Sequence, residues 1–245
     1  MSVFPEAPLR PRDLSHRSRE IEWLDGAGAG ATELEFFLRD LARLNSVMFG
    51  HRAVIAWLHR ATKDALSERP LTILDAGCGY GDLLRAIRRW ARKRGLAARL
   101  IGLDRSRETI SIAQAAGAET DDIEYQVGDI FEFRPLERID LVVSSLLAHH
   151  LSDELIVRLL RWMEVTAHRG WLIYDLQRHP VPHYFIALIG RLTRLSPLMI
   201  RDGLISVERS LTAAEWRERL VAADIACESV RLRWFLFRFV IGRLK

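Results

Sequence analysis

Apolar residues along the middle of the chain form short continuous runs that alternate with spaced, helix-like patterns. Continuous apolar runs predict buried β-strands, whereas spacings of three and four residues predict amphipathic helices. The predicted strands are residues 71–77, 98–104, 123–127, 139–145 and 170–176. The helices predicted between them are residues 82–94, 106–116 and 152–166. Alternating strands and helices indicate an α/β fold, with a Rossmann-like, doubly wound and mostly parallel sheet.

The two ends of the chain depart from this alternation. Residues 1–31 are interrupted by prolines and glycines. A helix is expected from Thr32, which forms a capping-box pattern with Glu35, and a second helix is expected after Gly50. The C-terminal part predicts one more helix and then two strands with a reversal near residues 234–236. The last two strands bring the predicted sheet to seven.

An apolar segment with several prolines follows the fifth predicted strand. We expect this segment, at about residues 178–207, to form a lid insertion; a buried packing hairpin is the alternative. The chain then divides into an N-terminal irregular segment with a helical cap, residues 1–50, and an α/β domain, residues 51–245.

The composition is that of a globular protein, with 49% apolar and 28% charged residues. No apolar stretch reaches the ~20 residues that a membrane-spanning helix needs, and two cysteines are too few for a disulfide framework. We therefore expect a cytoplasmic protein. The net charge is +4, and basic residues concentrate at residues 88–94 and 229–245. Acidic residues are interleaved with basic ones elsewhere, which argues against a nucleic-acid partner.

The stretch ILDAGCGYGDLLRAI, residues 73–87, joins a predicted strand to a predicted helix through three glycines. Such a turn lets the backbone approach a ligand closely. A phosphate-binding P-loop requires a lysine after its last glycine, and this loop has none. A dinucleotide-binding loop has the spacing GxGxxG, whereas the third glycine here comes one residue early.

The spacing of Asp75, Gly77, Gly79 and Gly81 resembles motif I of the class I methyltransferases that use S-adenosylmethionine (SAM). Later segments extend the resemblance. Asp104 ends the second predicted strand, Asp129 follows the third, and SSLLAHHL after the fourth resembles motif IV of the family. The resemblance spans roughly residues 50–245 and implies SAM as cofactor and S-adenosylhomocysteine (SAH) as product.

The resemblance implies a set of cofactor-binding residues. Asp75 is expected near the SAM ammonium and Asp104 at the ribose hydroxyls, although Asp104 could instead cap the following helix. Asp129 could instead be a turn residue. Cys78 is interpreted as a small loop residue. The expected cofactor-binding residues are Asp75, Gly77, Cys78, Gly79, Gly81, Asp104, Arg105, Asp129, Ile130, Ser145 and Arg52.

The segment after the fourth predicted strand bears on the methyl acceptor. It lacks the proline pair typical of methyltransferases that act on base amines, and it lacks the carboxylates of magnesium-dependent catechol enzymes. We therefore expect no metal. LLAHHL resembles the LHH segment of many small-molecule methyltransferases. A histidine of near-neutral pKa can take a phenolic proton, so His150 and His149 are the candidate bases, with His150 preferred and helix capping or packing as the alternative.

Within the predicted lid, His179, His183 and Tyr184 are candidate contacts to the acceptor, beside an apolar wall. These features favour O-methylation of a small hydrophobic or aromatic acceptor such as a phenol, quinol or polyketide. C-methylation of the quinone-biosynthesis type is the close alternative. RNA methylation through the basic clusters and a non-catalytic SAM-fold protein stay open. The apolar lid or the basic C-terminal tail could also contact a membrane.

Overall fold

A computed structural model describes residues 13–26, 30–47, 50–63, 69–117, 122–192 and 196–245. Within these ranges the chain forms one seven-stranded sheet in the order β3-β2-β1-β4-β5-β7-β6. All neighbouring pairs are parallel except those that β7 makes with β5 and β6. The predicted mostly parallel seven-stranded α/β sheet is thus confirmed. The strands are β1 Leu71–Ala76, β2 Ala98–Asp104, β3 Ile123–Val127, β4 Ile139–Ser145, β5 Ala167–Leu176, β6 Arg231–Phe235 and β7 Arg238–Leu244.

Four of the described helices, α4, α5, α7 and α8, begin at hydroxyl caps. Side chains of Ser106, Ser152, Ser196 and Thr212 each accept a hydrogen bond from a first-turn backbone N–H. The capping box at Thr212 is complete, as predicted. The helices are α1 Ala31–Val47, α2 Arg52–Ala61, α3 Asp82–Lys93, α4 Arg107–Ala115, α5 Asp153–Thr166, α6 Pro180–Leu192, α7 Pro197–Arg209 and α8 Ala213–Ala222.

Alternate residues of the central strands feed two separate hydrophobic cores, as the two-residue period of a strand requires. Leu74 and Val142 pack with α5 and α8 on one face of the sheet. Ile73 and Leu141 pack with α2 and α3 on the other face. Because both faces are covered, β1 is buried along its whole length, and this explains why it is mostly apolar, with Thr72 and Asp75 as its buried polar residues.

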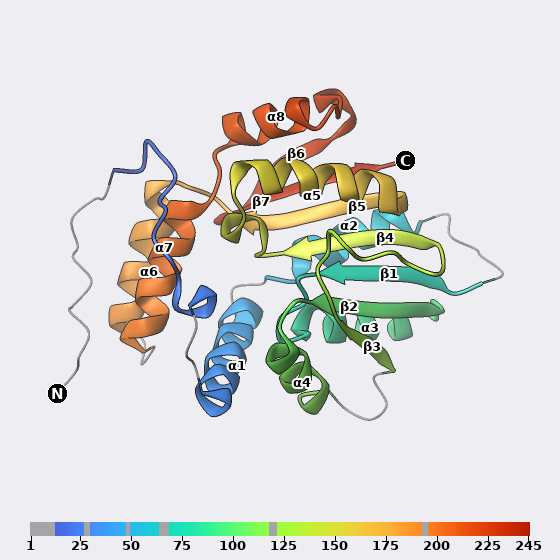
Figure 1. Ribbon diagram of the computed structural model, residues 1–245, viewed down its shortest axis with the longest axis horizontal. Helices are drawn as coiled ribbons and strands as arrows, with labels where there is room; N and C mark the ends of the chain where they lie inside the picture. Colours follow the sequence, from blue (N-terminus) through green and yellow to red (C-terminus); the bar gives the residue numbers. More distant parts are fainter. Residues whose placement is uncertain (1–12, 27–29, 48–49, 64–68, 118–121, 193–195) are drawn as a thin grey trace.

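Three helices gather at the end of the sheet toward which β1 and β4 point. Figure 1 shows α1 beside the pair α6 and α7 at this end, with the N-terminal segment running close to α7. The predicted lid is therefore a helical hairpin, with α6 packed on α7. The helix predicted to begin at Thr32 begins at Ala31, so Thr32 lies inside α1 and is not its cap.

The N-terminal segment is held by hydrogen bonds to distant parts of the chain. Arg17 donates to Asp153 Oδ1 at 2.6 Å and to the backbone carbonyl of Arg209 at 2.7 Å. Arg178, buried at the end of β5, donates to the carbonyl of Leu14 at 2.9 Å. These contacts hold the N-terminal segment across the carboxyl edge of the sheet. The sequence pattern predicted only irregular structure for these residues.

Candidate active site

A cavity of about 530 Å³ opens at the carboxyl edge of the parallel strands. Ligands of open α/β sheets bind at this edge, and the volume suits a small-molecule site. Its walls come from four parts of the chain. They are the glycine loop after β1, the ends of β2 and β4, the helices α1, α6 and α7, and the 3₁₀ turn Trp23–Asp25.

The glycine loop adopts a backbone that favours glycine. Gly77, Gly79 and Gly81 have φ values of +73°, +50° and +73°, in the left-handed region that side chains disfavour. A Cβ atom at Gly77 would contact Leu147, and one at Gly81 would overlap Tyr125. At Gly79, which lines the cavity, a Cβ would meet no described atom within 4 Å. Gly79 therefore leaves open a space that a ligand can fill.

Two carboxylates flank this loop. Asp104 holds the loop, because its Oδ2 accepts the Gly79 N–H at 3.0 Å and its Oδ1 accepts the Ser106 N–H at 3.0 Å. Asp75 is buried, and its Oδ1 accepts no hydrogen bond from the described residues. Burial, and then the nearby charges of Asp82 and Asp104, raise the pKa of Asp75 well above its usual value. A cationic ligand group would give Asp75 the partner that it lacks.

The residues around the glycine loop can be compared with the chemical groups of SAM. The space at Gly79, the Asp75 carboxylate with an unpaired oxygen, and the half-buried Asp104 at the carboxyl end of β2 suit a ligand that carries an ammonium, a sulfonium and a ribose. The cavity is also lined by Gly77, Cys78, Arg105, Asp129, Ile130 and Ser145. The cysteine is buried and burial raises the pKa of its thiol, as expected for a small loop residue.

Two expected cofactor contacts, Gly81 and Arg52, do not line the cavity; Gly81 packs against Tyr125 at the start of α3. Arg52 is exposed at the start of α2. Its neighbours Asn45 and His51 do line the cavity. His51 Nε2 lies 2.8 Å from Asp82 Oδ2, and Asn45 Oδ1 accepts from Arg238 at 2.7 Å. The first turn of α2 points Arg52 toward solvent. The sequence spacing alone did not determine which residues of this turn face the cavity.

The two candidate histidines follow β4 on a 3₁₀ turn, Ala148–His150, after Leu146 at φ +59°. His149 is buried, and its Nδ1 lies 2.6 Å from Asp175 Oδ1 near the end of β5. Asp175 Oδ2 also accepts the backbone N–H of His149 at 3.1 Å. The pair is therefore fixed at two points, with the His149 Nε2 atom on the side away from Asp175.

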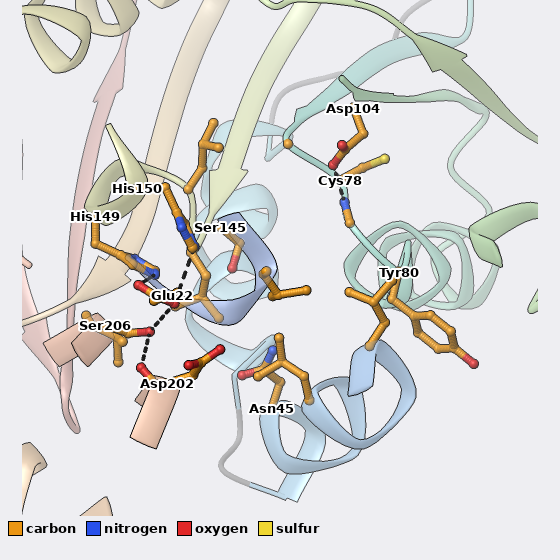
Figure 2. A pocket seen from close by; sticks show the side chains of 18 of the residues that line it. Glu22, Asn45, Cys78, Tyr80, Asp104, Ser145, His149, His150, Asp202 and Ser206 are labelled. Carbon is orange, nitrogen blue, oxygen red and sulfur yellow. Dashed lines mark hydrogen bonds and ion pairs between the residues drawn. The ribbon is translucent and has the colours of Figure 1, made fainter. Parts of the chain in front are cut away.

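Glu22 enters this cluster from the N-terminal segment. Its Oε1 lies 3.9 Å from His149 Nε2, and its Oε2 lies 3.9 Å from His150 Nε2. Figure 2 shows Glu22 between the histidines and Ser206, whose hydroxyl donates to Glu22 Oε2 at 2.7 Å. Burial raises the pKa of Glu22 to about 6. No sequence motif pointed to Glu22, which is 127 positions before His149.

A second carboxylate reaches the same end of the cavity from α7. Asp202 Oδ2 accepts the backbone N–H of Trp23 at 2.9 Å, whereas its Oδ1 accepts no hydrogen bond from the described part of the chain. Asp202 and Ser206 are four residues apart, so one face of α7 presents both. This i, i+4 spacing inside a predicted lid was the one sequence signal that could have identified them.

The predicted acceptor contacts on the lid lie outside the cavity. His183 is buried with Nε2 3.0 Å from Glu208 Oε1, the His179 ring lies 5.9 Å from the Trp234 ring in a tilted arrangement, and Tyr184 is exposed. The segment is an α-helix, and its period turns Pro182, Phe185 and Ile186 toward the cavity instead. The prediction of a lid insertion carried no helical phase for this segment, and the structure places His179, His183 and Tyr184 beside the cavity and not in its lining.

Glu22, His149 and His150 are also close enough to be compared with a metal centre. One ligand atom from each lies within 4.8 Å of the others. Tetrahedral zinc ligands at about 2.1 Å from the ion lie about 3.4 Å apart, so the 3.9 Å pairs would have to contract. Arg209 already brings a cation here, with Nη1 2.5 Å from Asp25 Oδ2 and 3.5 Å from Glu22 Oε1.

Residues 73–170 match the family described as "Methyltransferase domain". The trans-aconitate 2-methyltransferase of Mycobacterium tuberculosis (strain ATCC 25177 / H37Ra) is 31% identical over 110 residues, 44% of this chain and 38% of that relative. The ubiquinone biosynthesis O-methyltransferase of Rhodopseudomonas palustris (strain BisB5) is 29% identical over 157 residues, 62% of this chain and 56% of the relative. The matches thus span less than three fifths of either relative's length.

Among solved structures, human N-acetylserotonin methyltransferase in complex with SAM aligns with a TM-score of 0.62 at 17% identity. The alignment covers 88% of this chain and 56% of the human chain. At this identity the likeness concerns the fold. Together with the glycine loop, Asp104 and the sheet order, it agrees with the family match. Residues 73–170 thus resemble a methyltransferase domain, and the chain shares the Rossmann-like fold of the SAM-dependent methyltransferase to which it aligns.

Proposed function

We propose that the protein transfers a methyl group from SAM to a hydroxyl of a small aromatic acceptor, without a metal ion. The observation that carries the proposal is the buried His149–Asp175 pair, 2.6 Å apart, on the wall of the cavity that the glycine loop also lines. A phenolic hydroxyl is a weak nucleophile until it loses its proton. A positioned histidine supplies the base for that step.

His149 suits this role better than His150, the histidine preferred from sequence. A carboxylate only accepts hydrogen bonds, so Asp175 fixes the proton of a neutral His149 on Nδ1 and leaves a lone pair on Nε2. His150 has a comparable partner in Asp25 at 3.0 Å, but it is less buried and Arg209 also binds that carboxylate. We therefore assign the base to His149 and a supporting position to His150.

SAM supplies, when bound, an electrophilic methyl group on a sulfonium sulfur. The chain supplies the remaining requirements. His149 takes the acceptor proton at Nε2, Asp175 stabilises the resulting imidazolium, and the apolar walls exclude water. The oxygen then forms the new bond to carbon as the sulfur–carbon bond breaks, so SAH leaves as a neutral thioether and the proton remains on His149.

The cavity walls favour an aromatic acceptor. Large apolar side chains line the cavity, among them Leu24, Phe37, Leu38, Phe185, Met199 and Phe237. The polar end is rich in carboxylates and would repel an anionic acceptor such as aconitate. The O-methyltransferase relative therefore offers the better analogy. C-methylation uses the same base, and its product distinguishes it in the test below.

The basic cluster at residues 88–94 gives little support to an RNA substrate. Arg88 is buried and donates to the carbonyls of Ala98 and Asp122 at 2.7 and 3.0 Å. Arg94 donates to the Thr62 hydroxyl at 3.1 Å and lies over the Trp90 ring. These guanidinium groups make structural contacts within the domain.

Incubating the wild-type protein with labelled SAM and a panel of phenols, quinols, fatty acids and RNA tests the proposal. We expect label in the phenols as a methyl ether, with the rate unchanged after dialysis against EDTA. Mass spectrometry and NMR of the product locate the methyl group. Label on a ring carbon, label confined to RNA or fatty acids, or loss of activity in EDTA with recovery on adding Zn²⁺ or Mg²⁺ would contradict it.

We further propose that the lid side of the protein contacts anionic membranes, from which a hydrophobic acceptor would be drawn. Large apolar side chains are exposed on one face of α6 and at the end of β6 with the turn that follows it. The His179 ring, just before α6, lies 5.9 Å from the Trp234 ring. Arg231 and Arg233 are exposed beside them. Among the described residues, no helix is long and apolar enough to cross a bilayer. The apolar patch comprises Val181, Tyr184, Leu188, Trp234 and Leu236.

Replacing Trp234 and Leu236 together by serine is expected to weaken binding to phosphatidylserine-containing vesicles by about fivefold or more, because both side chains are exposed apolar anchors. Co-sedimentation with vesicles measures the change. Serine at Leu136, which is fully exposed on a distant loop, is the matched control and should have no effect. Equal binding by the double variant and the wild type would show that this patch does not contact lipid.

A further inference from the structure

One end of the cavity contains more hydrogen-bond acceptors than donors. We call this end the carboxylate pole and define it by Glu22, Asp202, His149 and His150, all of which line the cavity. His149 Nδ1 and His150 Nδ1 both contact carboxylates. Each contact places a proton on Nδ1, so in the neutral imidazole, the form that can act as a base, each Nε2 atom is an acceptor.

The remaining acceptors of the pole are carboxylate oxygens. Glu22 Oε1 and Asp202 Oδ1 are buried and accept no hydrogen bond from the residues that the structure describes. Glu22 and Asp202 are both almost completely buried, at 3% exposure each. Buried polar atoms without partners destabilise a protein, so their retention in a cavity points to a ligand that completes them.

The nearby donors are already engaged. The Ser206 hydroxyl lies 2.7 Å from Glu22 Oε2 and 2.8 Å from the carbonyl of Asp202. The Arg209 guanidinium donates to Asp25 and to the carbonyls of His149 and His150. Donors for the open acceptor atoms must therefore come from the molecule that binds in the cavity.

The number of hydrogen-bond donors needed at these acceptor atoms limits which molecules can bind there. His149 Nε2 and Glu22 Oε1 lie 3.9 Å apart, too far for a hydrogen bond between them. A single hydroxyl has one hydrogen and cannot serve both atoms. Two hydroxyls on one benzene ring can, because neighbouring or meta substituents are separated by a comparable span.

We propose that the methyl acceptor is a di- or polyhydroxylated aromatic ring: one hydroxyl meets His149 and is methylated, and a second donates to Glu22 or Asp202. This inference rests on the proposed function and specifies its substrate class. A neutral donor is favoured over an ammonium because Arg209 already places a cation beside Glu22 and Asp25. The second hydroxyl keeps its proton in the carboxylate hydrogen bond, so the product is a monoether.

Two probes that differ only at the second hydroxyl test the proposal: 5-pentylresorcinol and 3-methoxy-5-pentylphenol. We expect wild-type kcat/KM to favour the resorcinol by about tenfold or more, because masking one hydroxyl leaves a buried carboxylate unpaired. Glu22→Gln and Asp202→Asn should each reduce the preference to within about threefold. Glu20→Gln, an exposed position on the same segment, should retain it.

Calorimetric titration of both probes into the SAH-saturated protein separates this inference from the proposed function. Tighter binding of the resorcinol that is lost in Glu22→Gln would support the carboxylate pole even if no phenol were methylated. Methylation of both probes at equal rates would overturn the inference while leaving the proposed function intact. Preference for 3-(aminomethyl)phenol, which brings an ammonium, would also overturn it. Thermal melts and SAH affinity identify any variant that fails to fold.

Discussion

Replacing Gly79 by asparagine is expected to weaken SAH binding about a hundredfold or more, because the new side chain occupies the space where the cofactor binds. A Cβ at this position meets no described atom within 4 Å, so the protein itself has room for the substitution. Gly79 has φ +50°, and asparagine tolerates this left-handed region better than most residues do. Calorimetric titration with SAH measures the loss.

Gly95→Asn provides the matched control for that result. Gly95 has φ +62° and a Cβ there also meets nothing within 4 Å, but it follows α3 and does not line the cavity. It carries the same backbone strain without touching the ligand, so its SAH affinity should equal that of the wild type. Equal SAH affinity for Gly79→Asn and wild type would show that the cofactor lies elsewhere.

The second large effect is expected at His149. Glutamine at this position keeps a hydrogen-bonding side chain but cannot take the acceptor proton, so kcat should fall by about 10²–10⁴-fold. Asp175→Asn should also lower kcat, because an amide no longer stabilises the imidazolium and allows the wrong tautomer. SAH affinity should stay within about threefold of wild type in both variants, since the lost interaction belongs to the transition state.

His150→Gln distinguishes the two histidines. His150 pairs with Asp25, whose carboxylate is shared with Arg209, and we assign it a supporting position. A smaller loss of kcat than in His149→Gln is expected from steady-state assays at several pH values. If His150→Gln caused the larger loss, and raising the pH restored His149→Gln to the wild-type rate, the base would have to be reassigned to His150.

The expected cofactor-binding residues could be assigned to one edge of the sheet from sequence because most of them follow the ends of predicted strands. Parallel strands bring their carboxyl ends to one edge, so the loop after β1 and Asp104 after β2 had to meet. The hydrogen bond from the Gly79 N–H to Asp104 shows that the loop and this residue do meet. Two of the expected residues, Gly81 and Arg52, do not line the cavity. The direction of Arg52 depends on where α2 begins.

The acceptor half could not be predicted in the same way. Glu22, His149 and Asp202 come from three distant segments and meet only through tertiary packing of the cap against the sheet. The sequence of α6 did contain a helical pattern. Tyr184 is exposed and the next residue, Phe185, lines the cavity, as expected for neighbouring residues that point in different directions from a helix. Its prolines at 180 and 182 obscured the pattern, although proline is tolerated in a first helical turn.

A crystal structure of the protein with SAH and 5-pentylresorcinol tests the central claim most directly. The account predicts one phenolic oxygen within about 3 Å of His149 Nε2. The second oxygen should be hydrogen-bonded to Glu22 or Asp202, with SAH against Gly79 and Asp104. A ring bound away from His149, SAH outside the glycine loop, or a metal ion between Glu22 and the two histidines would contradict it.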